Sequence, residues 1–202
     1  MKEIILGKCM NLVKKNNPTY HEEKLEEIRY GLESIYLTYT KIFVIFVLAY
    51  FLGIIKETFL LLLTYNIIRT FAFGIHATKS IYCLITSLML FIGGVYIVKY
   101  MSLNIYVKTI ISIMLLICIY KYAPADTYKR PLINERKRKK YKVISTILGI
   151  AYVILIIILN NNIISNYLLI GMLESVIMIH PLIYKIFNLP FDNYKKYKLN
   201  TV

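Results

Sequence analysis

Long stretches without a charged side chain constrain this sequence more than any other feature. Residues 80–98 form an uncharged run, close in length to the roughly 20 residues that an α-helix needs to cross a bilayer. A second run begins at Val143 and carries no charge until Glu174, which is too long for one membrane helix. The three asparagines at 160–162 divide this run into two halves. We therefore expect an all-α integral membrane protein.

The composition agrees with this fold class and excludes two others. Hydrophobic residues make up 58% of the chain and charged residues 18%, whereas soluble domains have roughly 45–50% and about a quarter. Such a high apolar content excludes a disordered chain. The net charge of +14 lies between long apolar runs rather than on one folded surface, so we expect no nucleic-acid partner.

Six apolar segments are expected to be helical, and four to six of them to span the membrane. Three contain a basic residue, namely Lys41, Arg69 or Lys108, and the second and fourth segments are the weakest. The segments are residues 35–55, 59–75, 80–98, 103–120 and the two halves of 143–184. The apolar stretch at 4–6 is too short for a signal peptide, so the chain is expected to insert through its own helices.

The polar segments predict the domain organisation. Residues 1–33 are expected to form an amphipathic helical region, cytosolic or at the membrane surface, because apolar residues recur there at helical spacing among glutamates. Residues 34–184 would form the membrane domain, with a basic cytosolic loop at 121–142. Residues 185–202 would form a cytosolic tail.

The distribution of Lys and Arg predicts the orientation. The loop 121–142 holds nine of them, so the positive-inside rule places it in the cytosol. Six crossings would put both termini on that side, together with every basic residue except Lys56, Lys99 and Lys108. The turn around Gly74 would then also lie at the cytosolic face.

Residues with catalytic chemistry gather at that turn. The thiolate is the reactive form of cysteine, and a neighbouring imidazole such as His76 can take the proton of Cys83. A continuous helix would separate the two by about 10.5 Å along its axis, so we expect a broken backbone near Gly74. Spacing alone leaves open that Cys83 packs as a small hydrophobe and that His76 is a polar anchor. The scattered cysteines and histidines predict no metal, and no cofactor is expected.

Three segments carry a more specific pattern. The first is Arg69-Thr-Phe-Ala-Phe-Gly74-Ile-His76 followed by Cys83, the second is 122–131 followed by the basic run, and the third is Glu174 with Pro181. In this order they resemble the AgrB family, the membrane peptidases of accessory gene regulator quorum sensing, and the third match is the loosest. One departure is that many members have paired glycines before the histidine, where this chain has Phe73 and Gly74.

The resemblance implies a cysteine endopeptidase in which Cys83 is the nucleophile and His76 its base. It implies that an AgrD-type propeptide is cleaved at the C-terminal side of its signal core, leaving an acyl-enzyme. A cysteine or serine of the propeptide would then close a thiolactone or lactone ring. Water must be excluded, because it would hydrolyse the intermediate. Membrane lipids and a second copy of the chain, in a homodimer, are the other implied partners.

Two charged residues within apolar segments are expected to support the site. Arg69 would bind a substrate carboxylate or stabilise an oxyanion, or else reach to the membrane interface. Glu174 is the only carboxylate in 143–184, and we expect it to pair with Arg69 or to orient His76. A purely structural ion pair is the alternative.

The basic run has two interpretations. It is a topology signal that also attracts anionic lipid. The family resemblance implies a second role, in which the run binds the acidic C-terminal tail of the propeptide through charge complementarity. The residues concerned are Arg136, Lys137, Arg138, Lys139 and Lys140.

Two other functions are alternatives to the peptidase. A non-enzymatic membrane protein, such as a peptide exporter or an assembly subunit, would use Cys83 only for packing. A membrane transferase of lipid head groups would need clustered acidic metal ligands, whereas the acidic residues beyond the N-terminal region are scattered.

Overall fold

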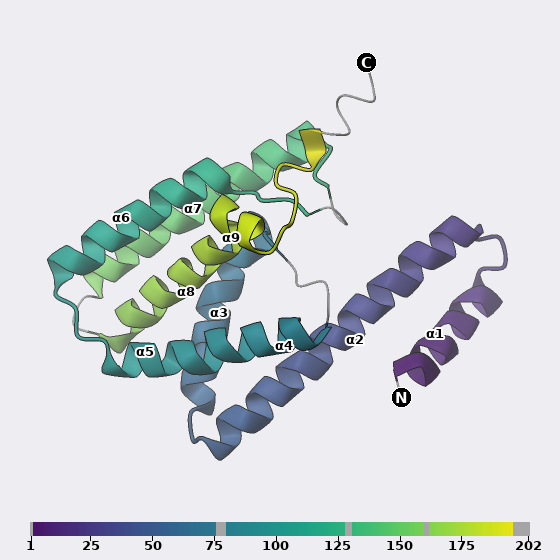
Figure 1. The fold of residues 1–202 in the computed structure, drawn as a ribbon, viewed down its shortest axis with the longest axis horizontal. Coiled ribbons are helices and arrows are strands. Elements are labelled where there is room, and N and C mark those ends of the chain that lie inside the picture. Colours follow the sequence, from purple (N-terminus) through teal and green to yellow (C-terminus); the bar gives the residue numbers. More distant parts are fainter. Residues whose placement is uncertain (1, 76–79, 128–130, 160–161, 196–202) are drawn as a thin grey trace. The chain divides into compact units, whose positions relative to one another are not determined.

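A computed structural model describes residues 2–75, 80–127, 131–159 and 162–195 of the 202-residue chain. It divides into two compact units, residues 1–51 and 52–202. In the described residues every regular element is helical, which confirms the predicted all-α fold (Figure 1).

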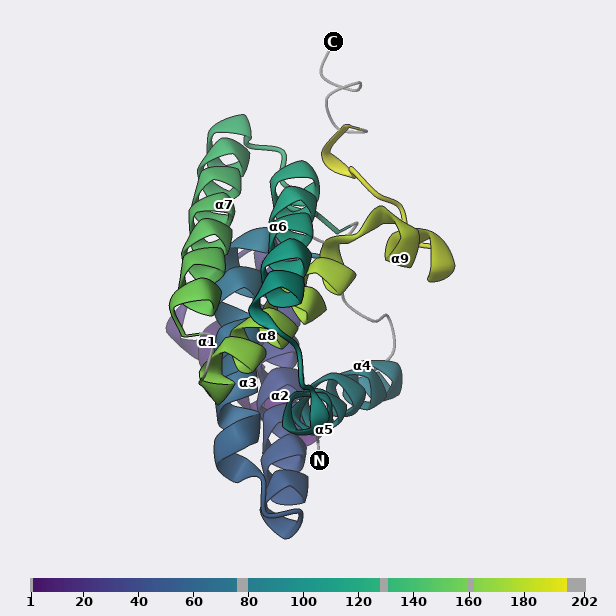
Figure 2. The same ribbon diagram turned by 90° about the vertical axis from the view of Figure 1, so that its left-hand side faces the viewer.

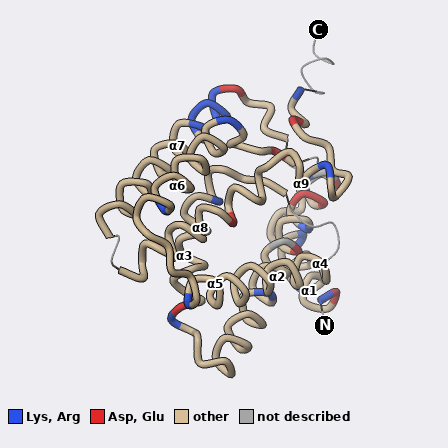
Figure 3. The backbone as a smooth tube through the Cα atoms, turned by 60° about the vertical axis from the view of Figure 1, so that its left-hand side comes forward, with Lys and Arg blue, Asp and Glu red and all other residues tan. Residues whose placement is uncertain are grey.

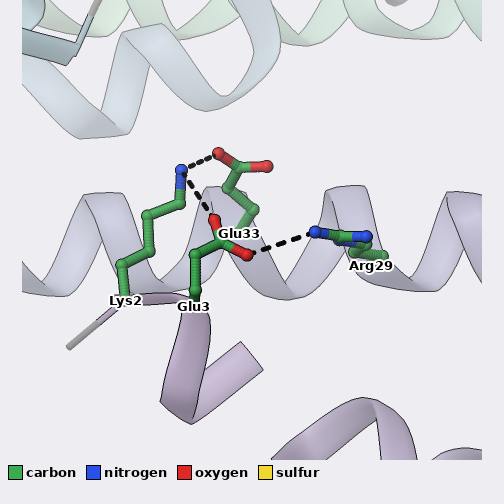
Figure 4. A network of polar contacts seen from close by, with 4 residues as sticks. All are labelled: Lys2, Glu3, Arg29 and Glu33. Carbon is green, nitrogen blue, oxygen red and sulfur yellow. Dashed lines mark hydrogen bonds and ion pairs between the residues drawn. The ribbon is translucent and has the colours of Figure 1, made fainter. Parts of the chain in front are cut away.

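The first unit is a pair of helices, α1 (Lys2–Asn16) and α2 (Glu22–Phe51). Four charged side chains join them: Lys2 bonds to Glu33, and Arg29 donates to Glu3 over 3.2 Å (Figure 4). Exposed ion pairs contribute little stability, so these contacts chiefly fix which faces meet. Helix α2 joins the second part of the predicted amphipathic region 1–33 to most of the first apolar segment, 35–55, without a break.

The second unit contains the other apolar segments, and each of them is helical as predicted. Residues 80–100 form one continuous helical run with a single π-helical turn in the middle, a feature often found at functional sites. The elements are α3 (Ile55–Ala72), α4 (Ser80–Leu88), η1 (Met89–Gly93), α5 (Gly94–Tyr100), α6 (Ile105–Tyr122), α7 (Glu135–Ile158), α8 (Ile163–Ile179) and α9 (Pro181–Ile186).

Asparagine side chains set the start of three helices. Asn104 accepts from Val107 N at the start of α6, and Asn134 accepts from Lys137 N at the start of α7. Asn162 does the same for α8, where it accepts from Ile164 N over 3.0 Å. Asparagine is a preferred N-cap because its oxygen satisfies a backbone N–H that has no partner within the helix. This confirms the predicted division of the long apolar run near 160–162.

Helix α8 is the central element of the second unit. Most of its residues are buried, and it contacts α3, α5, α6 and α7. Helices α6 and α7 run alongside one another and pack on α8 (Figure 2). Gly171 allows α3 to approach closely, and there Thr64 Oγ1 donates to the Tyr167 carbonyl over 3.2 Å. The Tyr152 hydroxyl donates to the Thr64 carbonyl over 2.8 Å, which ties α7 to the same contact.

In the described part of the chain, four helical stretches are long and apolar enough to cross a membrane. They are Lys24–Phe51, Ile81–Tyr100, Ile105–Tyr122 and Glu135–Ile158. Helix α3 carries three charged residues, and α8 has only 17 residues. The protein is therefore a multi-pass membrane protein.

Candidate active site at the Gly74 turn

Helix α3 stops at Ala72 because the next two residues leave helical geometry. Phe73 has a φ of 57° and Gly74 a φ of 114°, in the region that favours glycine. The predicted break in the backbone is thereby confirmed for residues 73–75. His76 lies outside the described residues, so its distance from Cys83 stays a prediction.

Three backbone hydrogen bonds fix the turn between two other segments. Gly74 N donates to the Ala125 carbonyl over 2.8 Å, and Ala125 N donates to the Ala72 carbonyl over 2.9 Å. Ile75 N donates to the carbonyl of Met178, near the end of α8, over 3.0 Å. The three segments that carry the sequence pattern therefore meet at one end of the second unit.

The side chain of Arg69 lies inside this turn. Its Nη2 donates to the Ile75 carbonyl over 2.6 Å. Its Nη1 lies so close to Gly74 that a Cβ atom there would overlap it, and also the Met178 carbonyl oxygen. Glycine is thus required both by its φ and by the space that Arg69 occupies. Nη1 is buried and, among the described residues, has no hydrogen-bond partner.

Cys83 lies in the first turn of α4, eight residues after Ile75 in the chain, and is half-buried. Its carbonyl accepts a bond from Ser87 Oγ over 2.8 Å. Tyr65 lies one helical turn before Arg69 on α3, and its ring packs on Phe91 of η1 with centroids 5.3 Å apart. Sequence reasoning missed Tyr65, because one tyrosine among 19 gives no signal of its own.

Glu174 is 3% exposed, and the expected ion pair with Arg69 is not formed in the structure. Its Oε1 lies against Gly94, where α5 begins, and beside Leu61 of α3. Arg69 is eight residues further along α3 than Leu61, about 12 Å of helical rise, and its guanidinium reaches toward the turn instead. Oε2 of Glu174 has no partner among the described residues. His76 lies outside the described residues, so the orientation of its ring by Glu174 stays a prediction.

The basic run opens α7 and lies at the same end of the unit as the turn (Figure 3). The ring of Tyr141 packs against that of Phe73, with centroids 5.1 Å apart. Within the run, Arg138 stacks on the Tyr194 ring at 3.7 Å and Lys139 pairs with Glu135 over 3.3 Å. The other three members, Arg136, Lys137 and Lys140, are exposed.

Asp126 organises the loop before the basic run, a role that its place in the second motif did not reveal. It is 3% exposed, and its carboxylate accepts from Leu132 N, Asn193 N and Tyr194 N at 2.8–3.3 Å. The Tyr184 hydroxyl donates to the Asp126 carbonyl over 3.1 Å. This one carboxylate therefore fastens the C-terminal segment to the loop that holds the Gly74 turn.

No metal centre is evident in the described part of the chain, where no group of three or more His, Cys, Asp or Glu residues could hold an ion. Cys9 and Cys118 lie in α1 and α6, on other elements than Cys83. The predicted site residues offer instead the thiol of Cys83, the guanidinium of Arg69 at the turn and, further along α3 and α8, the buried carboxyl group of Glu174. This set suits acyl-transfer chemistry.

The sequence matches the family model described as Accessory gene regulator B over residues 7–179. The chain belongs to the Accessory gene regulator B (AgrB) family. The accessory gene regulator protein B of Staphylococcus aureus is 32% identical over 173 residues, 85% of this chain and 90% of that protein. An AgrB-like protein of Listeria innocua is 31% identical, covering 93% of this chain and 92% of its own. Another, from Clostridium acetobutylicum, is 30% identical and covers 87% and 84%. No solved structure matches the chain.

Membership in the AgrB family implies involvement in the peptide processing of accessory gene regulator quorum sensing. The matched region includes all the residues of the Gly74 turn and Cys83, and also Asp126 and Glu174. The resemblance read from the motifs is thereby confirmed over most of the chain.

Proposed function

We propose that this chain is a membrane cysteine endopeptidase that cleaves an AgrD-type propeptide and promotes its cyclisation. The observation that carries the proposal is the position of Cys83, in the first helical turn after a backbone break that sequence reasoning required for a His76–Cys83 pair. Family membership supports it, because the family takes part in processing a quorum-sensing peptide.

In the proposed reaction, His76 accepts the thiol proton and the Cys83 sulfur attacks the scissile carbonyl carbon. A C–S bond forms while the carbonyl π electrons move to oxygen. The tetrahedral species collapses, the peptide C–N bond breaks, and the amine of the C-terminal fragment leaves with the proton that His76 returns. The core remains attached to Cys83 as a thioester.

Cyclisation then exchanges one thioester for another. A thiolate of the propeptide attacks the acyl carbon, the bond to the Cys83 sulfur breaks, and the enzyme thiolate takes up a proton. A serine hydroxyl in place of the thiol would give a lactone by the same path. The step needs water to be excluded, and a site among membrane helices provides that environment.

The proposal also covers location and substrate capture. The Gly74 turn and the basic run share one end of the second unit. The nine basic residues of 121–142 support a cytosolic location for that end by the positive-inside rule, and with six crossings both termini would lie there too. The exposed Arg136, Lys137 and Lys140 would hold the acidic tail of the propeptide by charge. Homodimerisation stays part of the proposal as a family expectation.

Co-expression with an AgrD-type propeptide tests the function. The wild-type chain should release the C-terminal fragment, whereas Cys83→Ala and His76→Ala should not. Cys118→Ala is the matched control, because Cys118 is also half-buried in an apolar helix, and it should cleave like the wild type. Equal cleavage by Cys83→Ala would refute the peptidase and favour a non-enzymatic membrane protein, such as a peptide exporter.

A further inference from the structure

Helix α9 and the residue after it expose an apolar surface at one end of the second unit. Leu182, Ile186 and Phe187 are each more than half exposed, although all three are large hydrophobic side chains. The other side of α9 is anchored, because Tyr184 is buried and its hydroxyl donates to the Asp126 carbonyl over 3.1 Å. Figure 2 shows α9 projecting sideways from the pair formed by α6 and α7. The apolar surface therefore faces away from the bundle.

The depth of α9 follows from contacts with the ends of two candidate membrane spans. Lys142 is the last charged residue before the apolar part of α7, and its Nζ lies 4.7 Å from the ring centroid of Tyr120 in the last turn of α6. The His180 ring, directly before α9, packs against the Tyr122 ring with centroids 4.9 Å apart. Tyrosines are typical of membrane interfaces, and lysines near helix ends reach toward them. Helix α9 therefore begins level with the boundary between the apolar core of a bilayer and its head groups.

A groove beside this apolar surface has the chemistry of a lipid head-group site. It encloses about 400 Å³, and its apolar wall includes Tyr184 and Leu189. Lys185 and Asn188 supply polar groups, and none of the described residues that line the groove is acidic. Lys185 is exposed, and an ammonium group at a membrane surface attracts anionic lipid. Lys185 also lies one helical turn after Leu182, so the groove and the apolar surface adjoin.

We propose that α9 lies in the head-group region of the bilayer and binds an anionic phospholipid there. The acyl chains contact the exposed apolar surface of α9. Lys185 binds the phosphate, and the groove beside Asn188 holds the rest of the head group. Residues 185–187, which the sequence places at the start of a cytosolic tail, then lie at the membrane instead. Lipid binding here does not depend on the proposed peptidase function.

The charge of this surface favours a lipid over a second copy of the chain. A symmetric contact between two copies presents the same patch from both sides, so it would bring two Lys185 side chains together. The described lining of the groove offers no carboxylate to pair with them. An anionic phospholipid complements both the charge and the apolar surface, as in helices that lie in the membrane plane.

The chain contains no tryptophan, so one introduced tryptophan reports on its own surroundings. The test places full-length Phe187→Trp in phosphatidylcholine vesicles whose acyl chains carry bromine near the head group, because bromine quenches tryptophan only at short range. Fluorescence should fall about twofold or more relative to vesicles without bromine, and Ile186→Trp should behave alike. Ile133→Trp is the matched control. Ile133 is also exposed, but it precedes the start of α7, about 10 Å of helix beyond Lys142, so its fluorescence should not change.

Three results of this experiment would overturn the proposal. The first is a lack of quenching in both Phe187→Trp and Ile186→Trp, which would place α9 in water. The second is equal quenching in Ile133→Trp. The third is a blue-shifted emission without quenching, which would indicate that protein, such as a second copy, covers the surface.

The preference for anionic lipid is measured in the Phe187→Trp chain. A small share of the phosphatidylcholine is replaced by brominated phosphatidylglycerol or, in a parallel sample, by brominated phosphatidylcholine. We expect phosphatidylglycerol to bind about fivefold more tightly, and this preference to fall to about twofold or less when Lys185→Gln is added. Lys195→Gln is the control, because Lys195 is a nearby exposed lysine already paired with Asp192, and it should keep the preference. A preference that persists in Lys185→Gln, or that is lost equally in Lys195→Gln, would contradict the assigned head-group site.

Discussion

The guanidinium Nη2 of Arg69 donates to the carbonyl oxygen of Ile75 over 2.6 Å, across the turn that ends α3. A hydrogen bond from a charged group contributes about 1.5–3 kcal/mol, so it is among the stronger single contacts at this turn. Ile75 is the residue directly before His76. The arginine of the first motif therefore helps to fix the backbone directly before His76, the proposed base for Cys83.

The tight fit of Arg69 against Gly74 makes a substitution there costly. Gly74→Ala would place a Cβ onto Arg69 Nη1 and the Met178 carbonyl, at a φ that alanine disfavours. We expect propeptide cleavage to fall at least tenfold and the thermal midpoint in detergent to drop. Gly93→Ala is the control, because no atom lies within 4 Å of that added Cβ, and it should change neither quantity. Full activity of Gly74→Ala would contradict the described turn.

Replacing Phe73 by glycine should be tolerated. Its positive φ is strained by about 1–3 kcal/mol for a residue with a side chain, and glycine would relieve this. The exchange would also lose the ring contact with Tyr141, worth about 0.5–1.5 kcal/mol. Because the two effects oppose each other, we expect Phe73→Gly to retain cleavage within about threefold of the wild type. A loss as severe as in Gly74→Ala would show that the ring itself is needed.

Asp126 should govern the attachment of the C-terminal segment. In Asp126→Asn an amide group would face the backbone N–H groups of Leu132, Asn193 and Tyr194, and at least one of these bonds would be lost. At about 1.5–3 kcal/mol per charge-assisted bond, opening of the segment should increase at least tenfold. Limited trypsin digestion after Lys185, followed in membranes, measures this.

The matched control for that experiment is Asp192→Asn. Asp192 forms only an i,i+3 ion pair with Lys195 near the surface, and such pairs contribute about 0–1 kcal/mol. Its digestion rate should stay close to that of the wild type. Equal rates for both variants would show that Asp126 does not fasten the segment.

The exposed members of the basic run should determine how tightly the propeptide binds. Replacing Arg136, Lys137 and Lys140 by Gln removes three exposed charges and leaves the Arg138–Tyr194 stacking intact. We expect KM for the propeptide to rise at least tenfold at low salt, and its increase with salt to become shallower, while kcat stays within twofold. A wild-type KM that is independent of salt between 50 and 500 mM would rule out capture by charge.

Hydrophobic patterning predicted the helices well because burial in a bilayer leaves few alternatives for a long apolar run. The break after Ala72 also followed from sequence, since Gly74 and the spacing of His76 and Cys83 demanded it. One of the three asparagine caps lies in the 160–162 cluster, where the sequence already predicted that the apolar run divides. These features are local, so the residues that cause them are neighbours in the chain.

Contacts between segments that are distant in the chain could not be predicted from the sequence. Lys108 looked like an interruption of an apolar segment, yet it is 4% exposed and donates to Ser165 of α8 over 2.8 Å. Arg69 and Glu174 seemed a natural ion pair, but their depths along α3 and α8 differ. Tyr65 of α3 contacts Phe91 of η1 and Ser175 of α8, residues that are distant from it in the chain. Such placements depend on how the helices pack, and a single sequence does not show which residues of two helices lie opposite one another.

The covalent intermediate tests the central claim most directly. Purified wild-type chain would be mixed with an AgrD-type propeptide whose ring-forming residue is changed to alanine, so that cyclisation cannot release the acyl group. Intact-mass spectrometry should then show an adduct whose mass equals that of the propeptide minus the released C-terminal fragment, sensitive to hydroxylamine and mapping to Cys83. The account is contradicted if the C-terminal fragment is released without any such adduct, or if the adduct forms equally in Cys83→Ala.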